Sequence, residues 1–390
     1  MNSRPYIIIG GGIIGSAIAR EILLRKLGDV VILEKEKEVG EHASGRNSGV
    51  IHSGINQKPG SMKARMCLEG SKRLRDYCRK QQVPMNECGT LVVANSESEE
   101  LTLSQLIQMG NEIGVPELRI IDQNELSRRE PAIIGTKALF SPTGAVVDSL
   151  ALMRAIAKDV QALGGVYHFS SEVTAIRNLT VVTKREELEA THIINCAGLY
   201  SDKIAHMMGV GLEYEVIPFR GEYMEVKNIP VNSMVYQAPD LRYPFLSVHF
   251  TRMTDGKLLA GPNAMLAFGR ESYEKQISFS ETFQMMQTGN FWKLISSKEF
   301  LSLAFHNAKT SLLKSEFLKE IHKLCPAVKE ENIVPYRAGI RAQMVNKKGK
   351  MVDDILVEFR EHSTHVLNAV SPGMTSALAF AEYVVNQLRK

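Results

Sequence analysis

The sequence lacks the features that mark membrane-spanning, secreted and repeat proteins. No stretch approaches the roughly 20 consecutive apolar residues needed to cross a bilayer. The five cysteines are an odd number and include no Cys-x-x-Cys pair, so reduced thiols are favoured over a disulfide framework. We find neither internal repeats nor a low-complexity linker. These absences favour a globular protein of a reducing compartment.

The sequence also lacks a large excess of either sign of charge. The 47 Lys and Arg residues are nearly balanced by 43 Asp and Glu residues, giving a formal net charge of +4, and the basic residues are dispersed. This balance argues against a nucleic-acid partner, whereas a mildly positive surface suits acidic substrates or an anionic membrane face. With 390 residues the chain is longer than most single domains, so we expect one large domain or two interleaved ones.

The sequence gives no sign of a metal site. The adjacent aspartates Asp353 and Asp354 have no histidine partners at ligand spacing. We therefore predict that the protein binds no metal.

The strongest positive signal lies near the start of the chain. An apolar strand predicted over residues 6–9 runs into the spacing Gly10-x-Gly12-x-x-Gly15, and an apolar helix follows. This order is typical of a dinucleotide-binding βαβ unit. Gly10 permits the tight turn, Gly12 lets the backbone approach a pyrophosphate, and Gly15 lets helix and strand pack closely. The helix N-terminus then offers free N–H groups to phosphates.

An acidic residue completes this signal. The helix is predicted to run from Ile13 to about Leu27, and a second strand over residues 30–33 ends on Glu34. Glu34 would accept hydrogen bonds from ribose hydroxyls, and its charge disfavours a 2′-phosphate. Strand, helix, second strand and terminal acid together indicate dinucleotide binding. The alternative is a glycine-rich turn in an ordinary α/β unit.

The remaining patterns predict an interrupted domain. Strand–helix patterns return around residues 149–195 and again after residue 335, whereas residues 214–260 read as strands and residues 281–323 as helix. We predict an α/β fold with a discontinuous Rossmann-like nucleotide-binding domain. An α+β substrate domain, built on a mixed or antiparallel sheet, is inserted into it.

A polar loop after Glu34 points to a particular kind of nucleotide. Residues 42–54 are rich in Ser, Gly and Asn, and such small side chains can approach a flat ring and its phosphates. An NAD-dependent enzyme makes no such demand on the residues past the acid. Together with residues 195–202 and 218–221, this loop resembles the D-amino-acid-oxidase-type FAD-dependent oxidoreductases.

Within that family the chain is most similar to the branch that oxidises L-2-hydroxyglutarate. Segments along nearly the whole chain carry this similarity: residues 47–54, 196–202, 218–221, 243–250, 261–264, 339–343 and 352–354. Residues 275–320 match the family only loosely. The C-terminal flavin loop, residues 370–375, is poorer in glycine than in the wider family.

The resemblance implies FAD as the cofactor and a small dicarboxylate as the substrate. The 2-hydroxyl of L-2-hydroxyglutarate would be oxidised to 2-oxoglutarate, with hydride passing from C2 to flavin N5. Electrons would then pass to a quinone, a carrier flavoprotein or oxygen. The FAD-binding domain would comprise residues 1–85, 142–220 and 335–390, and the substrate-binding domain residues 86–141 and 221–334.

Arginines are the natural partners for the two substrate carboxylates, because the guanidinium fork binds carboxylate bidentately. Arg341, just before the C-terminal flavin loop, is the first candidate, and its alternative is a structural salt bridge. Arg242 is the second candidate, with a solvent-exposed position as the alternative. Arg220 suits a loop-locking role as well as a ligand contact.

A base is needed because hydride leaves readily only from a developing alkoxide. His249 alternates with apolar Val248 and Phe250 on a predicted strand, so it should face away from them. Together with the resemblance, this makes His249 the candidate base. The alternative is a histidine that is hydrogen-bonded on a sheet face. His52 would lie near the flavin ring, and we expect FAD to be bound non-covalently.

The motif and the resemblance together nominate cofactor-binding residues in several segments. These are Gly10, Gly12, Gly15 and Glu34 for the ADP half, Ser44, Asn47, Ser48 and His52 for the pyrophosphate or ring, Val173 near adenine, Gly198 and Asp202 after a strand, and Gly373, Met374 and Thr375 at the start of the last helix. Asp202 would serve equally well as a helix N-terminal charge. The positive end of the last helix would stabilise negative charge on the reduced flavin.

Three other functions are compatible with parts of the sequence. A related flavin oxidase could act on an amino acid or on glycerol 3-phosphate, but residues 249 and 261–264 favour the hydroxy acid. An NAD-dependent dehydrogenase is disfavoured by residues 42–54. A non-catalytic flavoprotein would bind FAD that no hydroxy acid reduces.

The cellular position depends on residues 283–305. This segment mixes Phe, Met and Trp with Lys293 and Lys298, which is typical of an amphipathic helix on a membrane. A helix that covers the substrate domain has the same composition, and we favour that interpretation. We expect a cytoplasmic protein, peripheral at the inner membrane if the segment binds lipid. The glycine motif leaves no room for a transit sequence, and a transit sequence removed beforehand would make the protein mitochondrial.

Overall fold

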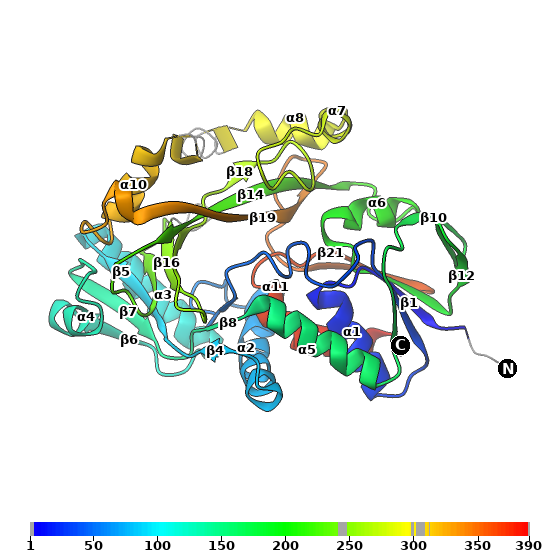
Figure 1. The fold of residues 1–390 in the computed structure, drawn as a ribbon, viewed down its shortest axis with the longest axis horizontal. Coiled ribbons are helices and arrows are strands. Elements are labelled where there is room, and N and C mark those ends of the chain that lie inside the picture. The colour runs from blue at the N-terminus through cyan, green and yellow to red at the C-terminus, as the bar shows by residue number, and fades with distance from the viewer. Residues whose placement is uncertain (1–3, 241–247, 298–299, 302–308, 312, 389–390) are drawn as a thin grey trace.

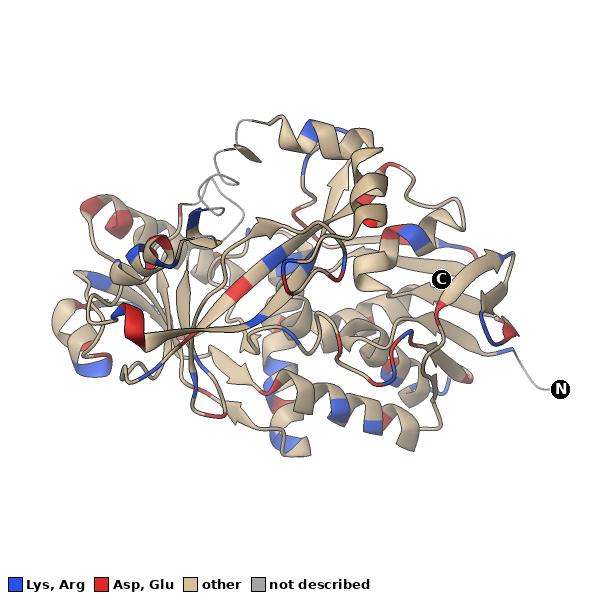
Figure 2. Cartoon of the chain, turned by 45° about the horizontal axis from the view of Figure 1, so that its top comes forward, with Lys and Arg blue, Asp and Glu red and all other residues tan. Residues whose placement is uncertain are grey.

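Two large sheets organise the chain (Figure 1). The computed structural model describes residues 4–240, 248–297, 300–301, 309–311 and 313–388. Within these residues no helix combines the length and the apolarity that crossing a bilayer requires. Lys and Arg are interspersed with Asp and Glu over the visible elements (Figure 2).

The first sheet has six strands and contains both strands of the predicted dinucleotide-binding unit. Its order is β20 (Leu356–Arg360), β21 (Ser363–Asn368), β13 (His192–Asn195), β1 (Tyr6–Ile9), β2 (Val30–Leu33) and β9 (Val166–His168). All neighbours are parallel except β20 and β21. On the central strand, Ile7 and Ile8 are fully buried. Burial on both faces explains why β1 is continuously apolar rather than alternating.

Helices cover one face of this sheet and a small sheet covers the other. The helices are α1 (Ile13–Leu24), α2 (Met62–Gln81), α5 (Ser149–Ala162) and α11 (Gly373–Gln387), which share one hydrophobic core with it (Figure 1). The three-stranded sheet contains β10 (Val173–Arg177), β11 (Thr180–Thr183) and β12 (Glu187–Glu189). Ile7, Ile9 and Val181 lie in the second core.

The second large sheet has nine strands and mixed direction. Its strands are β18 (Met265–Leu266), β14 (Tyr214–Val226), β17 (Leu258–Gly261), β16 (His249–Arg252), β15 (Met234–Gln237), β5 (Thr90–Ala94), β7 (Lys137–Ser141) and β6 (Arg119–Asp122), with β19 (Ile333–Asn346) paired to β14. The long β14–β19 pair runs from Tyr214 opposite Asn346 to Val226 opposite Ile333. Among the described residues of this sheet, β5 and β15 form the one parallel pair and the other neighbours are antiparallel, so the sheet is mixed.

The other elements surround this sheet and join it to the first. The helices are α3 (Glu97–Ile113), α4 (Gln123–Arg129), α6 (Ser201–His206), α7 (Phe279–Met286), α8 (Gly289–Ile295) and α10 (Lys314–His322). The short strands β3 (Val50–Ile51), β8 (Ala145–Val147) and β4 (Met85–Asn86) form a small sheet, and two 3-10 turns lie at Gly198–Tyr200 and Glu330–Asn332.

The predicted fold class is confirmed, with differences at some element ends. The first helix ends at Leu24 rather than near Leu27, because Lys26 adopts a left-handed φ of 53° that an α-helix does not accommodate. The helical region predicted over 281–323 is divided into α7, α8 and α10 where it is described. The domain boundaries at residues 220 and 335 fall within β14 and β19, and they stay predictions.

A buried histidine in the first sheet makes stability sensitive to acid. His365 on β21 is fully buried, with Nδ1 3.3 Å from the amide nitrogen of Asn195 and Nε2 3.0 Å from the hydroxyl of Ser363. Asn195 donates to Nδ1, so Nε2–H must donate to Ser363, and the ring is neutral. Burial lowers the pKa of His365 to about 4.

We expect His365 to contribute to acid destabilisation between pH 6.5 and 4. In that window the unfolded chain binds a proton that the folded ring refuses, so stability falls as the pH falls. The unfolding free energy falls when the pH is lowered from 7 to 5, and this fall should be smaller in the variant His365→Gln than in the wild type by on the order of 2 kcal/mol. Urea unfolding at both pH values measures this. Exposed His362→Gln is the control, and identical pH dependence in all three proteins would contradict the expectation.

Candidate active site

A cavity of about 1170 Å³ lies between the two sheets. It is lined from the turn after β1, the loop after β2, the turn after β13, strands β16 and β19, and the start of α11. Typical small-molecule pockets measure roughly 300–1,000 Å³. The cavity therefore has room for an extended ligand together with a small second molecule.

The turn between β1 and α1 is built from glycines for steric reasons. Gly10 has a φ of 107°, and a Cβ there would lie 2.4 Å from the carbonyl oxygen of Cys196. A Cβ on Gly15 would lie 2.1 Å from the carbonyl oxygen of Gly10, so helix and strand approach as the motif predicts. Gly10 and Gly12 line the cavity, whereas Gly15 lies behind its wall.

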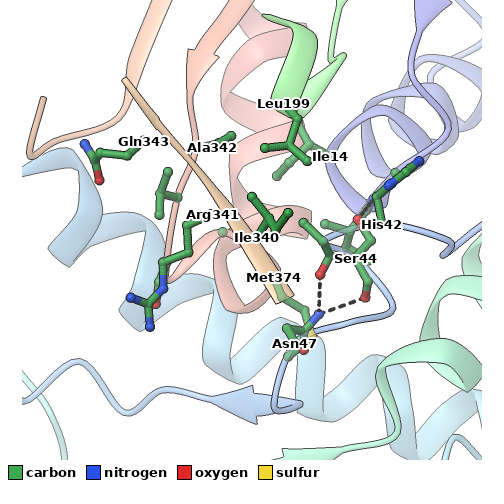
Figure 3. Close-up of a pocket in the computed structure, with 18 of the residues that line it drawn as sticks. Ile14, His42, Ser44, Asn47, Leu199, Ile340, Arg341, Ala342, Gln343 and Met374 are labelled. Carbon is green, nitrogen blue, oxygen red and sulfur yellow. Dashed lines mark hydrogen bonds between the residues drawn. The ribbon is translucent and has the colours of Figure 1, made fainter. Parts of the chain in front are cut away.

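The loop after β2 closes around the N-terminus of α1. Ser44 Oγ accepts a hydrogen bond of 2.9 Å from the backbone N–H of Ile13. The side-chain amide of Asn47 donates to the carbonyls of Ala43 and Ser44, and its oxygen accepts from the N–H of Gly49. Figure 3 shows the two bonds that the Asn47 amide donates, beside Met374. Asn47 therefore fixes the shape of a loop whose residues line the cavity.

Glu34 occupies the carboxyl end of β2, at the cavity wall. Its carboxylate accepts hydrogen bonds of 2.9 Å from the N–H groups of Gly11 and Glu36. Val173, from the small sheet on the outer face, lines the same end. This is the arrangement that a ribose-binding acid needs in a βαβ unit.

The start of α11 and the turn after β13 lie open to the cavity. A Cβ on Gly198 or Gly373 would meet no atom within 4 Å. Thr375 Oγ1 accepts a bond of 3.0 Å from the N–H of His52, which ties α11 to the polar loop. A helix N-terminus directed at a cavity favours negative charge there.

His52 lies where the polar loop meets the C-terminal loop. Its Nε2 is 3.4 Å from Ser371 Oγ, and it lines the cavity. Burial lowers the pKa of His52 to about 4, so the ring is neutral at pH 7.

His249 faces the cavity from β16, as the alternation predicts. Val248 and Phe250 are in a hydrophobic core, whereas His249 lines the cavity and is 7% exposed. Its ring stacks on the ring of Tyr236, with centroids 4.2 Å apart and planes 21° apart. The stack restrains the imidazole on a rigid strand.

Arg341 reaches the same cavity from β19, where it is opposite Phe219 (Figure 3). Burial lowers the pKa of Arg341, and nearby Tyr223 acts in the opposite direction. An arginine stays charged throughout the physiological range even so. Burial raises the pKa of the Tyr223 hydroxyl, and the neighbouring Ser48 side chain acts in the opposite direction.

Sequence reasoning missed the two tyrosines of this wall. Tyr223 and Tyr236 both line the cavity, next to Arg341 and His249 respectively. Tyr236 follows Met234 and Val235 on β15, and Tyr223 lies between Glu222 and Met224 on β14, so core packing is the simpler interpretation of each ring. A polar hydroxyl on such a strand is the one signal that could have drawn attention to them.

Some candidates lie elsewhere. Arg242 falls outside the described residues. Asp202 does not line the cavity. It is 3% exposed, and its carboxylate accepts bonds of 2.6 and 2.7 Å from the Arg270 guanidinium and one of 2.9 Å from the N–H of Val216. Arg220 is buried and pairs with Glu222 at 3.0 Å.

One group of three possible metal ligands exists among the described residues: Glu36, His42 and Glu271. Lys35 Nζ lies between them, 2.6 Å from a Glu271 oxygen and 2.7 Å from His42 Nε2. The ammonium group supplies the positive charge that a metal would bring. The prediction that no metal binds stays a prediction.

Known proteins resemble the chain over its full length. A profile of the FAD dependent oxidoreductase family matches residues 5–387. The L-2-hydroxyglutarate dehydrogenase of Salmonella houtenae is 36% identical over 98% of this chain and 93% of its own. The mitochondrial L-2-hydroxyglutarate dehydrogenase of Homo sapiens is 35% identical over 100% and 89%, respectively. The L-alpha-glycerophosphate oxidase of Mycoplasma pneumoniae, solved with FAD bound, has a TM-score of 0.80 and 25% identity over 100% and 96%.

Proposed function

The chain belongs to the FAD-dependent oxidoreductase family and, within it, to the L-2-hydroxyglutarate dehydrogenases, and we propose that it oxidises L-2-hydroxyglutarate to 2-oxoglutarate. One observation carries this proposal. The dinucleotide-binding turn, Arg341 and His249 all face a single cavity. A cation for a carboxylate and a base for a hydroxyl are what a hydroxy-acid substrate requires.

The residues of the cavity fit FAD as the extended ligand. Gly10 and Gly12 leave the backbone bare where a pyrophosphate would approach, and Gly198 and Gly373 leave open space that any side chain would reduce. Glu34 would bind the ribose, with Val173 near the adenine. The loop of Ser44, Asn47 and Ser48, with His52 beyond it, would border the ring, as would Met374 and Thr375 at the positive end of α11.

Two side chains act on the substrate, one as the carboxylate partner and one as the base. Bound FAD supplies the acceptor for the hydride that leaves C2 of the hydroxy acid. Arg341 binds a carboxylate and so fixes which face of C2 is presented. His249 takes the proton of the 2-hydroxyl, because the developing negative charge on that oxygen favours departure of the hydride. The Tyr236 ring, stacked on His249, holds the imidazole in place.

A substrate panel tests this function against its neighbours in the family. Purified holoenzyme is assayed anaerobically with an artificial electron acceptor on the L- and D-forms of 2-hydroxyglutarate, on L-glutamate and on glycerol 3-phosphate. We expect kcat/KM to be highest for the L-hydroxy acid, with one 2-oxoglutarate formed for every two electrons that the acceptor takes up. A preference for the amine or for glycerol 3-phosphate would replace this substrate by the alternative.

We further propose that helices α7 and α8 contact an anionic lipid surface, which would bring the flavin's electrons to a membrane quinone. The inward side of these helices covers the second sheet, because Met285, Phe291 and Leu294 share a core with it. The outward side is apolar as well. Its exposed apolar side chains are Phe279 at 83%, Phe283 at 63%, Trp292 at 51% and Met286 at 42%, interspersed with exposed Ser280, Gln284 and Gln287.

Positive charge borders this apolar surface. Lys293 on α8 is exposed and donates to the carbonyl of Lys347, which begins a turn with Lys348 and Lys350. Covering a sheet accounts for one side of the helices only, whereas aromatic side chains ringed by lysines are typical of a helix lying on anionic lipid.

The lipid contact is tested by flotation with vesicles. The wild type should float with phosphatidylcholine vesicles containing phosphatidylglycerol, and the double variant Phe283→Glu, Trp292→Glu should bind at least about tenfold less, because it places two charges in the apolar contact. Leu101→Glu, at another exposed apolar position (67% exposed), is the matched control and should float like the wild type. A wild type that stays unbound would contradict the proposal.

A further inference from the structure

A segment that follows the nine-stranded sheet contacts the loop after β2 of the six-stranded sheet. Residues 267–276, called the strap below, follow β18 of the nine-stranded sheet. Several of its partners are in residues 35–46, which follow β2 of the six-stranded sheet, and in residues 199–202 after β13. Many of these partners line the cavity, whereas Glu271 and Tyr273 do not. Other contacts, such as the ion pair of Lys275 with Glu222, hold the strap to its own sheet.

The first contact is charged. Lys35 Nζ lies 2.6 Å from Glu271 Oε1 and also contacts the carboxylate of Glu36. The Tyr200 hydroxyl donates to the same Glu271 oxygen at 2.7 Å. Burial opposes the charge on Lys35, but Glu271 and Glu36 outweigh it and raise the pKa of Lys35. Glu271 therefore connects the two cavity walls that begin after β2 and after β13.

The second contact is aromatic and lies beside the first. The Tyr273 hydroxyl is 2.7 Å from His42 Nδ1, and the two rings stack with centroids 5.9 Å apart. The Arg46 guanidinium lies over the same Tyr273 ring, 4.2 Å from its centroid. His42 Nε2 in turn is 2.7 Å from Lys35 Nζ, so both contacts belong to one network.

The strap itself is fixed at its start. Arg270 forms the two-pronged ion pair with buried Asp202 and also donates to the carbonyl of Leu199. The pair is 12% and 4% exposed at its two side chains, so it is well shielded from solvent. The predicted cofactor residue Asp202 is thus the anchor of the strap.

We propose that Glu271 and Tyr273 retain the cofactor by holding loop 35–46 closed over the ADP half of its cavity. This rests on the proposed function only through FAD, not through the substrate. Glu34, Ser44 and Asn47, at the ADP half and pyrophosphate, are on or beside that loop. A dinucleotide bound there would leave by movement of this loop, and the strap opposes that movement. Single exposed ion pairs contribute little, but here ion pair, hydrogen bonds and ring contacts are coupled in one network.

The test measures flavin release rather than turnover. Free flavin fluoresces more strongly than bound flavin, so dilution of holoenzyme gives a release rate directly. Glu271→Gln removes the charge that pairs with Lys35, and Tyr273→Phe removes the hydroxyl while keeping the ring under Arg46. Each variant should release FAD at least tenfold faster than the wild type. High salt should raise the release rate of the wild type toward that of Glu271→Gln, because salt screens the ion pair with Lys35. Glu274→Gln, an exposed neighbour on the same strap, is the matched control.

The outcomes separate this inference from the assignment of the substrate. With FAD in excess, both variants should keep the wild-type rate of reduction by L-2-hydroxyglutarate, because neither residue touches the cavity. Release rates equal to those of the wild type and of Glu274→Gln would overturn the role of the strap. If the variants release FAD faster but no hydroxy acid reduces the flavin, the role of the strap is supported and the proposed substrate is contradicted. Circular dichroism and thermal unfolding show whether each variant is folded.

Discussion

Replacing Arg341 by methionine is expected to lower kcat/KM for L-2-hydroxyglutarate by about 30- to 4,000-fold. Removing one partner of a desolvated, hydrogen-bonded charge pair costs about 2–5 kcal/mol, which is the source of this range. Methionine keeps much of the volume on β19 and removes only the cation. KM should rise because the carboxylate loses its partner in the bound substrate, and kcat should fall because Arg341 also orients C2. Steady-state kinetics with an artificial acceptor measure both.

Two further variants define what Arg341 contributes. Arg341→Lys keeps the charge but loses the planar fork, so it should restore only part of the activity. Arg360→Met removes an exposed arginine of β20 that pairs with Glu358, and it should behave like the wild type. If Arg341→Met keeps the wild-type KM and kcat, the carboxylate is bound elsewhere, and Arg242, outside the described residues, becomes the first alternative.

Replacing His249 by alanine should slow reduction of the bound flavin by about 10²- to 10⁴-fold, the usual contribution of a positioned base. The FAD content should not change, because His249 is on β16, away from the dinucleotide turn. The rate of flavin bleaching after anaerobic mixing with substrate measures the chemical step by itself. Its pH dependence should also lose the limb that reports deprotonation of the base.

The exposed His362→Ala is the control for His249, and His52→Gln tests a second histidine that lines the cavity. His52 has a pKa of about 4, so its protonation state does not change across the working pH range. An unchanged reduction rate in His249→Ala would remove that residue from the mechanism. If His52→Gln loses the rate instead, the base is on the polar loop rather than on the second sheet.

The nucleotide-binding half could be predicted because its signals are local. The positions of Gly10, Gly15 and Glu34 are set by turn geometry and by one strand–helix–strand unit, and the structure has them where the spacing requires. The alternation around His249 is likewise local, since a strand turns successive side chains to opposite faces. Arg341 was found through the family resemblance, and its role stays a proposal.

What the sequence did not reveal depends on contacts between distant segments. The partner of Asp202 is Arg270, which lies 68 residues later in the chain, beyond β14. No spacing rule connects the two residues. Tyr236 meets His249 only because β15 and β16 pair, and Tyr223 meets Arg341 only because β14 pairs with β19. The strap contacts are of the same kind. Long-range pairing decides these neighbours, and periodicity alone does not.

The most direct test is an anaerobic visible spectrum of the purified protein, recorded before and after addition of L-2-hydroxyglutarate, with the D-form as control. We expect a flavin absorption band that the L-form bleaches with one equivalent of 2-oxoglutarate formed per flavin, and that the D-form leaves unchanged. A flavin band that neither form alters would contradict the proposed substrate while leaving the family and the cofactor in place. A protein purified without flavin that also fails to take up added FAD would contradict the account as a whole.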